Sequence, residues 1–429
     1  MNPSISGMRH GVLAALLIVG LPPSGTSQQS ARAPEARGAA RHDRVFLGDV
    51  SRAIDLSARY LESACGQSGR FNYLLDPNSG RQSPSYDIVR HAGAMYALAM
   101  LNRLHPDSKA IEAMARAAAF LRANYIGPDE RSGALVVWSR PLPTKSDADL
   151  GAAGLGLVAL AGLDQARPGA VPLTDLQGLA RFIVFLQRSD GSFASKYRLG
   201  SGPVEDWNSL YYPGEAALGL ISLYELDHRR GWLDAAGKAL SFLARSRTRL
   251  RIAEMPPDHW ALIATARFLP YCRQGDCAAS RTELVEHAAH ICDRFLREQI
   301  GDAADTRLIG GFDAGGRTAP SATRLEGLLA ALEFLPDDAT GRRGDIEGAV
   351  EQGIAFLLRS QITTGPYAGG MPGTVSGVGS IMFQADPRAS DIRIDYVQHA
   401  LSAWLRYQAM FSGSAANGIG GERKKSLSN

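Results

Sequence analysis

Polar side chains gather at the start of six otherwise apolar segments. The first segment, "YDIVRHAGAMYALAML" (86–101), opens with Asp87, Arg90 and His91 and continues with mostly apolar residues. The other five begin with Asp147 and Asp149; Tyr211, Tyr212 and Glu215; Asp258, His259 and Trp260; Ser321, Arg324 and Glu326; and Asp395, Tyr396 and His399. Carboxyl, imidazole and guanidinium groups transfer protons and bind polar ligands. The recurrence predicts that these residues share one polar site.

Glycoside hydrolysis is the first chemistry that the set could perform. It needs two carboxyl groups beside the scissile bond, one protonated as the acid and one ionised as the base or nucleophile. The preferred acid/base candidates are Glu215 and Asp258, and the other candidate carboxyl groups are Asp87, Asp149, Glu326 and Asp395. The predicted substrate-binding residues are Asp87, Arg90, Arg324, Tyr211, Tyr212, Trp260, Asp395 and Tyr396. Trp138 and Trp207 are further rings that could stack on a sugar face.

Proton abstraction beside a uronate carboxylate, as in polysaccharide lyases and C5-epimerases, is the alternative. It needs an arginine against the carboxylate and a histidine or tyrosine as the base. Arg90 and Arg324 suit the first role, and His91, His259, His399 and Tyr211 suit the second. A non-catalytic carbohydrate-binding or envelope assembly protein is a third possibility, which would show no carboxyl group with a shifted pKa.

Structural roles compete with these assignments. Asp147 and Ser321 stand where helix N-caps stand, and Asp258 fits a cap as well as an acid. His91 and His399 lie one turn inside their helices, as buried histidines with hydrogen-bond partners also do. Glu215 and Glu326 could serve as partners of the arginines. No cofactor or metal is predicted: His91, His259 and His399 could form a zinc site, but no HxxxH pair supports it.

Twelve amphipathic or apolar helices must position these residues. The predicted ranges are 46–65, 86–104, 108–124, 149–164, 174–188, 213–227, 231–246, 257–270, 281–299, 321–334, 345–360 and 395–411. No convincing strand is predicted. Counted along the chain, the odd-numbered helices end with similar sequences, as in "ARFIVFLQRSDGSF" and "GIAFLLRSQ". The even-numbered helices begin with the polar residues described above. This is a repeat of about 60 residues, six times over, which predicts an all-α ring of helical hairpins with the even helices inside. An open solenoid of stacked helix pairs is the competing arrangement.

Here the chain resembles the six-hairpin (α/α)6 toroid superfamily over roughly residues 45–411. The resemblance implies a single toroid domain, and the superfamily includes glycoside hydrolases, polysaccharide lyases, sugar epimerases and, more distantly, terpenoid cyclases. "FLQRSDGSF" (185–193) is similar to the Gln-aromatic repeat of terpenoid cyclases. The chain has no DxDD run for terpenoid cyclisation, and "DADL" (147–150) is a poor substitute. We therefore predict a carbohydrate-active enzyme that acts on an oligo- or polysaccharide at the toroid mouth and is most similar to glycoside hydrolases.

The ends of the chain have a different composition from its body. Arg9 and His10 precede the apolar run "GVLAALLIVGL" (11–21), which is typical of a signal peptide and short for a membrane span. We predict a signal peptide or anchor at 1–22, a flexible tether at 23–44, the toroid at 45–412 and a disordered basic tail at 413–429. The predicted location is periplasmic or secreted, with no integral membrane span after signal cleavage.

Charge and cysteine content narrow the possible partners. Formal net charge is only +3, and no long basic run interrupts the 429 residues, so no nucleic-acid partner is predicted. The four cysteines are Cys65, Cys272, Cys277 and Cys292. Export would allow disulfides, and Cys272 and Cys277 bracket a loop short enough for one to close, although four cysteines permit three full pairings.

Overall fold

The computed structural model describes residues 44–272, 277–337, 339–375 and 389–417. The predicted signal peptide, residues 23–43 of the tether and residues 418–429 of the basic tail lie outside the described residues. The α-helices are α1 (Arg44–Ala64), α2 (Ile88–Leu104), α3 (Ser108–Tyr125), α4 (Leu150–Ala166), α5 (Leu173–Phe185), α6 (Tyr212–Asp227), α7 (Arg230–Arg247), α8 (His259–Phe268), α9 (Arg281–Glu298), α10 (Thr318–Leu332), α11 (Arg342–Ser360) and α12 (Ile394–Asn417). Each of the twelve predicted helices is confirmed, with boundaries shifted by a few residues.

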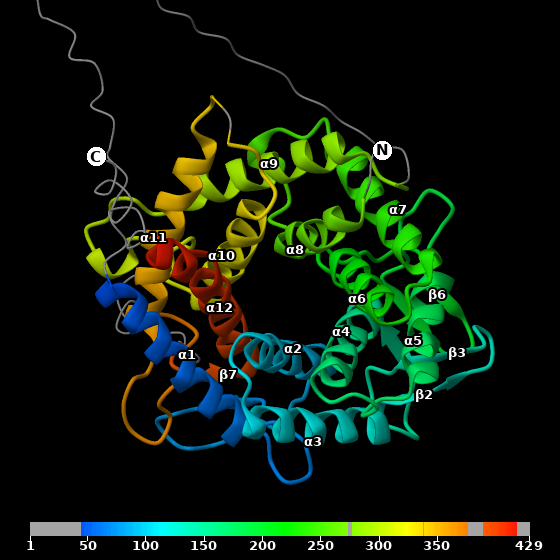
Figure 1. Cartoon of the computed structure of the whole chain (residues 1–429). Coiled ribbons are helices and arrows are strands. Elements are labelled where there is room, and N and C mark those ends of the chain that lie inside the picture. Colours follow the sequence, from blue (N-terminus) through cyan, green and yellow to red (C-terminus); the bar gives the residue numbers. More distant parts are fainter. Residues whose placement is uncertain (1–43, 273–276, 338, 376–388, 418–429) are drawn as a thin grey trace, which may run out of the picture. The chain divides into compact units, whose positions relative to one another are not determined.

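The even-numbered helices form a closed inner ring (Figure 1). Each packs on the next even helix, and α12 packs on α2 to complete the circle. The odd-numbered helices lie outside, and α1 packs on α12, so the first helix of the described chain covers the last. This is the predicted (α/α)6 toroid, and the contact between α12 and α2 excludes an open solenoid.

Residue composition separates inner from outer helices. Inner helix α4 (LGAAGLGLVALAGLDQA) is apolar on all sides, and most of its side chains are buried. A helix that is apolar all round is stable only when neighbours cover it on every side. Glycine lets these neighbours approach: a Cβ atom on Gly154 would lie 2.6 Å from the carbonyl carbon of Glu215 in α6. The outer helices are amphipathic and expose their polar faces.

The repeated exits of the outer helices join neighbouring hairpins. The side-chain amide Nε2 of Gln187 donates to the carbonyl of Ala235 in α7, at 2.9 Å. Gln299 makes the same bond to Ala349 in α11 at 2.7 Å, and Gln361 to Ala53 in α1 at 3.0 Å. The glutamine of the repeat therefore ties one outer helix to the next, and the third of these bonds crosses the closure of the ring.

Short strands in the long loops were not predicted. They are β1 (Leu74–Leu75), β2 (Ile126–Asp129), β3 (Ala134–Val137), β4 (Asp147–Asp149), β5 (Lys196–Arg198), β6 (Gly202–Val204) and β7 (Ile392–Arg393). They pair antiparallel as β1 with β7, β2 with β3, and β4 with β5 with β6. Strands of two to four residues leave too short an alternating pattern to detect in a sequence. They fix the loops that lead into α4, α6 and α12.

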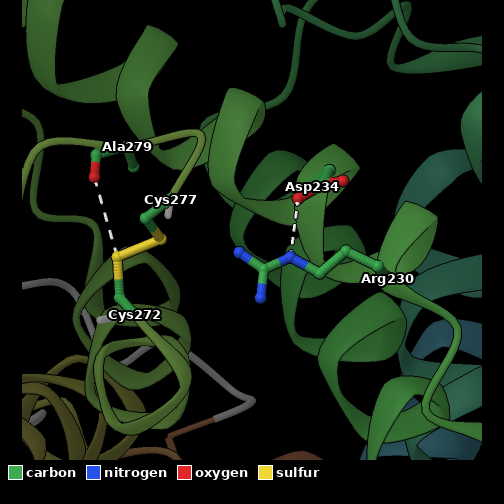
Figure 2. The surroundings of a disulfide bond; sticks show 5 residues. All are labelled: Arg230, Asp234, Cys272, Cys277 and Ala279. Carbon is green, nitrogen blue, oxygen red and sulfur yellow. Dashed lines mark hydrogen bonds and ion pairs between the residues drawn. A yellow bond between two sulfur atoms is a disulfide. The ribbon is translucent and has the colours of Figure 1, made fainter. Parts of the chain in front are cut away.

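The cysteines divide into one disulfide and two thiols. Cys272 and Cys277 are joined by a disulfide near Ala279, after the end of α8 (Figure 2), as the short loop between them suggested. Cys65 and Cys292 are free and buried. Over the described ranges, every helix is too short or too polar to cross a lipid bilayer.

Candidate functional site

A cavity of about 480 Å³ opens at the N-terminal ends of the inner helices. The long loops that enter these helices surround it, so the face predicted to carry the site does carry a cavity. Eleven predicted residues line it: Asp87, Arg90, Tyr211, Tyr212, Glu215, His259, Trp260, Arg324, Asp395, Tyr396 and His399. The remaining three predicted site residues, His91, Asp258 and Glu326, are not part of the lining.

Two histidines and a glutamate form a buried group in the wall of this cavity. His399 Nδ1 lies 2.6 Å from Glu326 Oε2, and His259 Nε2 lies 3.9 Å from the same oxygen. Glu326 is fully buried behind the two rings, whose centroids are 5.5 Å apart. When Glu326 is ionised it accepts the Nδ1 proton of His399, which leaves the Nε2 lone pair of that ring available as a base. The three residues come from α10, α8 and α12, which explains why no local motif signalled them.

His259 has no hydrogen-bond partner within the described structure. Both of its ring nitrogens are buried and unpaired. The ring packs against Tyr211 at 5.2 Å and Trp260 at 5.0 Å between centroids. Burial, followed by the nearby His399 and Arg324, lowers the pKa of His259 well below its usual value, so the ring is neutral at pH 7. A buried, unpaired imidazole beside a cavity is a strong indication of a functional group.

Arg90 is fixed at the cavity by carboxylates from two helices. Its guanidinium group lies 2.5 Å from Asp87 Oδ2 and 3.1 Å from Asp395 Oδ2, and it donates to the Tyr73 hydroxyl at 2.7 Å. Arg393 binds the same Asp395 at 2.6 Å. Two arginines and two aspartates thus form one network that joins the start of α2 to the start of α12.

Arg324 is paired with a residue that the sequence did not indicate. Its Nε donates to Glu298 Oε2 of α9 at 3.1 Å, and its guanidinium group packs on the Phe295 ring. Arg90 is bound by aspartates and Arg324 by Glu298, so neither Glu215 nor Glu326 is the ion-pair partner of these arginines. That leaves both glutamates available for other roles.

Glu215 is a buried carboxyl group on the cavity wall. It lies in the first turn of α6, is 4 % exposed, and its Oε2 has no hydrogen-bond partner among the residues that the structure describes. Burial, and then the negative charges of Asp258, Asp87 and Asp149, raise its pKa to about 8. Glu215 is therefore protonated at pH 7 and can donate a hydrogen bond or a proton.

Asp258 belongs to the scaffold, which corrects its predicted role as an acid or base. It is fully buried, caps α8 by accepting from the Ala261 amide at 3.0 Å, and pairs with Arg247 of α7 at 2.9 Å. Arg247 also contacts His287 of α9. With both oxygens occupied, Asp258 does not face the cavity. It fixes the start of α8 and so the position of His259, the next residue.

His91 is also a structural residue and not a base at the mouth. Its Nδ1 lies 2.7 Å from the Tyr86 hydroxyl and its Nε2 lies 3.1 Å from the Ala117 carbonyl of α3. Phe71 and Phe120 pack around the ring. At position 91 the helix turns the side chain outward between α2 and α3, whereas Arg90 faces the ring interior.

The predicted caps at Asp147 and Ser321 are wrong. Asp147 lies in β4, and the following cap position, Asp149, makes no side-chain cap bond. Helix α10 starts at Thr318, three residues before the predicted start, so Ser321 lies inside it and accepts from the Phe312 amide. Arg393 and Arg317, which also line the cavity, were missed. They stand in or after loops, where no periodicity marks them.

The same group of residues also offers donor atoms for a metal ion. His259, Glu326 and His399 each offer a ligand atom, and these atoms lie within 4.8 Å of one another. Two ligand atoms of one tetrahedral zinc ion, each about 2.0–2.2 Å from the metal, stand about 3.3–3.6 Å apart. The 2.6 Å between His399 and Glu326 fits a shared proton. The zinc site of His91, His259 and His399 that was suggested by the sequence does not form, because His91 lies away from the cavity.

Comparisons with known proteins bear on the fold. No family model and no curated protein matches the sequence. Among solved structures, a sugar epimerase from a ruminal bacterium has a TM-score of 0.64 at 11% identity, over 85% of this chain and 99% of that one. A D-mannose isomerase has a TM-score of 0.64 at 9% identity, over 86% of this chain and 98% of that one. An unsaturated glucuronyl hydrolase specific for heparin has a TM-score of 0.58 at 12% identity, over 85% of this chain and 97% of that one. At these identities the similarity establishes the shared toroid fold.

Proposed function

We propose that the protein moves a proton next to the carbonyl group of a reducing sugar, as an epimerase or an aldose–ketose isomerase. The observation that carries this proposal is the pair of imidazoles, His259 and His399, on one cavity wall with Glu326 behind them. Two adjacent imidazoles suit such a transfer, because one removes and returns the proton while the other donates a hydrogen bond to the oxygen that becomes charged.

The residues divide the steps among them. His399, oriented by Glu326, takes the proton from the carbon beside the carbonyl of the open-chain sugar, and an enediolate forms. Neutral His259 donates an N–H hydrogen bond to the developing oxygen charge, and the protonated His399 returns its proton to the sugar. Return to the neighbouring carbon gives the isomer, and return to the opposite face of the original carbon, after the enediolate has rotated, gives the epimer.

Charge pairing favours a neutral sugar over a uronate. The four arginines of the lining all have carboxylate partners: Arg90 pairs with Asp87 and Asp395, Arg393 with Asp395, Arg317 with Asp313, and Arg324 with Glu298. Such paired cations leave little surplus charge for a substrate carboxylate. The epimerase and isomerase among the compared structures support the same choice of chemistry.

Glycoside hydrolysis is the second candidate, and one observation favours it. Glu215 is a carboxyl group held protonated at the cavity, which is what a general acid needs. Asp258 was the preferred partner of Glu215 in hydrolysis. Asp258 forms a buried ion pair with Arg247 and so does not serve as the base or nucleophile. Asp87 and Asp395 are the remaining carboxylates of the lining, but Asp87 is already bound to Arg90 and the Val89 amide, and Asp395 to Arg90 and Arg393. The hydrolytic proposal therefore ranks below proton transfer.

The other two readings have less support. A purely binding protein gives no reason for a buried, unpaired His259 or for a carboxyl group with a raised pKa. A terpenoid cyclase needs an apolar cavity, and arginines and aspartates line this one. We retain periplasmic or secreted location as part of the proposal. The disulfide between Cys272 and Cys277 supports it, because disulfides persist in oxidising compartments.

The test is an incubation in D₂O of the purified protein with mannose, glucose, fructose, cellobiose and mannobiose, followed by NMR. We expect deuterium at C2 together with a new epimer or ketose. His399→Gln should lower the rate by about 10²-fold or more, and Glu326→Gln by about 10- to 100-fold. His105→Gln, at an exposed histidine of the opposite face, is the matched control and should keep full activity.

Three results would decide against the proposal. They are no deuterium exchange with any of these sugars, exchange that survives His399→Gln, and release of reducing ends from a polysaccharide that depends on Glu215 but not on His399. The last result would establish the hydrolytic candidate instead.

A further inference from the structure

The toroid has a second cavity at the opposite end of its inner ring. It measures about 370 Å³ and is lined by residues near the C-terminal ends of all six inner helices. Its volume falls within the range of small-molecule pockets, about 300–1,000 Å³. None of the residues assigned to the proposed reaction lines it, so it has no role in the site described above.

The inner wall of this cavity is apolar. Val158, Leu218 and Ile263 form it from α4, α6 and α8, and Met100 and Met410 close it from α2 and α12. The methionine side chains are flexible and adapt to the shape of an apolar ligand. Leu104, at the edge, is 41 % exposed. An apolar chain placed here would cover surface that is now exposed to water.

The rim of the cavity carries an excess of positive charge. Arg267 is bound by Glu225, with Nε at 2.5 Å from Oε1, and Arg406 is bound by Glu333 at 2.7 Å. Arg103, the third arginine, has only a neutral partner, the Gln165 side-chain oxygen at 3.1 Å. Among the described residues no carboxylate forms an ion pair with it. In addition, the Nε of Arg406 is buried and has no hydrogen-bond partner in the described part of the chain.

We propose that this second cavity binds a small amphipathic monoanion, namely a carboxylate with a short acyl chain. The chain would lie on the wall of Val158, Leu218 and Ile263, and the carboxylate would meet Arg103 at the rim. A guanidinium group without a carboxylate partner binds such a group in two parallel hydrogen bonds. A neutral or cationic ligand would leave this charge unmatched.

The position of the cavity connects it to the catalytic wall. Tyr96 lines the second cavity, Trp260 lines the first, and their rings are 5.7 Å apart, so a single aromatic layer separates the two. Two ion pairs connect α10 and its C-cap to α12: Glu326 with His399 beside the first cavity, and Glu333 with Arg406 beside the second. The two ion pairs are seven residues, or about two helical turns, apart along each segment.

Calorimetric titration of the purified protein with octanoate tests the site directly. We expect saturable binding of one octanoate per chain, with octan-1-ol and octyltrimethylammonium binding at least about tenfold more weakly. Arg103→Gln should weaken octanoate binding about tenfold or more. Arg181→Gln, which removes an exposed arginine from outer helix α5, should leave it unchanged. Ala409→Phe, which fills the rim, should abolish it.

Each contrary result has a defined meaning. Absence of saturable octanoate binding overturns the site. Equal binding of octanoate and octan-1-ol overturns the choice of an anion. If Arg103→Gln lowers the melting temperature but leaves binding unchanged, Arg103 only offsets the negative end of α2, and the assignment fails. Because the readout is binding, the result does not depend on whether the proposed sugar chemistry is correct.

Discussion

The glutamates Glu215 and Glu326 are both buried on inner helices but differ in what surrounds their oxygens. Glu326 Oε2 is bound by His399, and the carboxylate fixes the orientation of that ring. Glu215 faces the cavity with one oxygen unpaired and three other carboxyl groups nearby, which raises its pKa to about 8. In the proposed reaction, Glu326 thus positions the base His399, and Glu215 is a neutral donor toward the cavity.

The raised pKa of Glu215 predicts a pH dependence of stability. The ordinary pKa of the group, 4.5, applies to the unfolded chain, and about 8 applies to the folded protein. Between these values the folded state holds a proton that the unfolded state has released. This contribution to the free energy of unfolding is therefore full below pH 4.5, decreases as pH rises toward 8 and is lost above it.

Glu215→Gln should remove this dependence. Urea unfolding at pH 5 and pH 9 should show the variant gaining stability relative to the wild type at pH 9, by an amount of the order of a few kcal/mol. Glu112→Gln, on the outer helix α3, provides the background pH dependence. An unchanged difference between Glu215→Gln and wild type at the two pH values would mean that Glu215 is not protonated in the folded state.

At the level of elements, the outer helices are joined by a repeated contact. After each glutamine that bonds to the next helix comes a glycine that approaches the same helix. Gly191 has φ +96°, and a Cβ atom there would lie 2.4 Å from the Lys238 carbonyl oxygen of α7. Phe193 follows and is buried. The repeat "QRSDGSF" therefore encodes packing between hairpins and not chemistry.

Gly191→Ala should destabilise the protein substantially, with Gly200→Ala as the matched control. Both glycines have positive φ, which costs about 1–2 kcal/mol for an alanine. At Gly200 a Cβ atom meets nothing within 4 Å, so we expect no further loss there. At Gly191 the collision with the backbone of α7 should add about 1–3 kcal/mol. Equal losses of unfolding free energy for the two variants would show that the close approach does not matter.

For the described toroid as a whole, closure of the ring brings its first and last helices together. The rings of Phe46 in α1 and Tyr407 in α12 are 5.8 Å apart, and Gln408 donates to the Ser51 hydroxyl at 2.7 Å. In an open stack of six hairpins these helices would stand at opposite ends. The ring thus has no terminal hairpin with an uncovered face.

A circular permutant tests this closure. Joining the end of α12 to the start of α1 by a short Gly-Ser linker, and opening the chain at Gly169 between α4 and α5, should preserve helix content and a single cooperative unfolding transition. Gly169 is suitable because a side chain there would meet open space. A permutant opened inside α4, which the ring buries, is the control and should not fold. Loss of helix content in the Gly169 permutant would argue against a closed ring.

The sequence by itself determined the twelve helices, their pairing and the face on which polar residues gather. These follow from local periodicity and from a repeat that recurs six times, and each hairpin needs only its own residues and its neighbours to bury its apolar face. Eleven of the fourteen predicted site residues line the cavity for the same reason: the start of every inner helix reaches one mouth.

Only the tertiary structure decided what each of these residues does. His91 and His399 look alike in the sequence, yet one ring packs between α2 and α3 and the other meets Glu326 of α10, 73 residues away. Asp258 became a buried cap because Arg247 of α7 approaches it, while Glu215 found no cation and remained protonated. Whether a carboxyl group or an imidazole acts as a base, a donor or a support depends on charges and burial supplied by distant segments, and no local pattern records them.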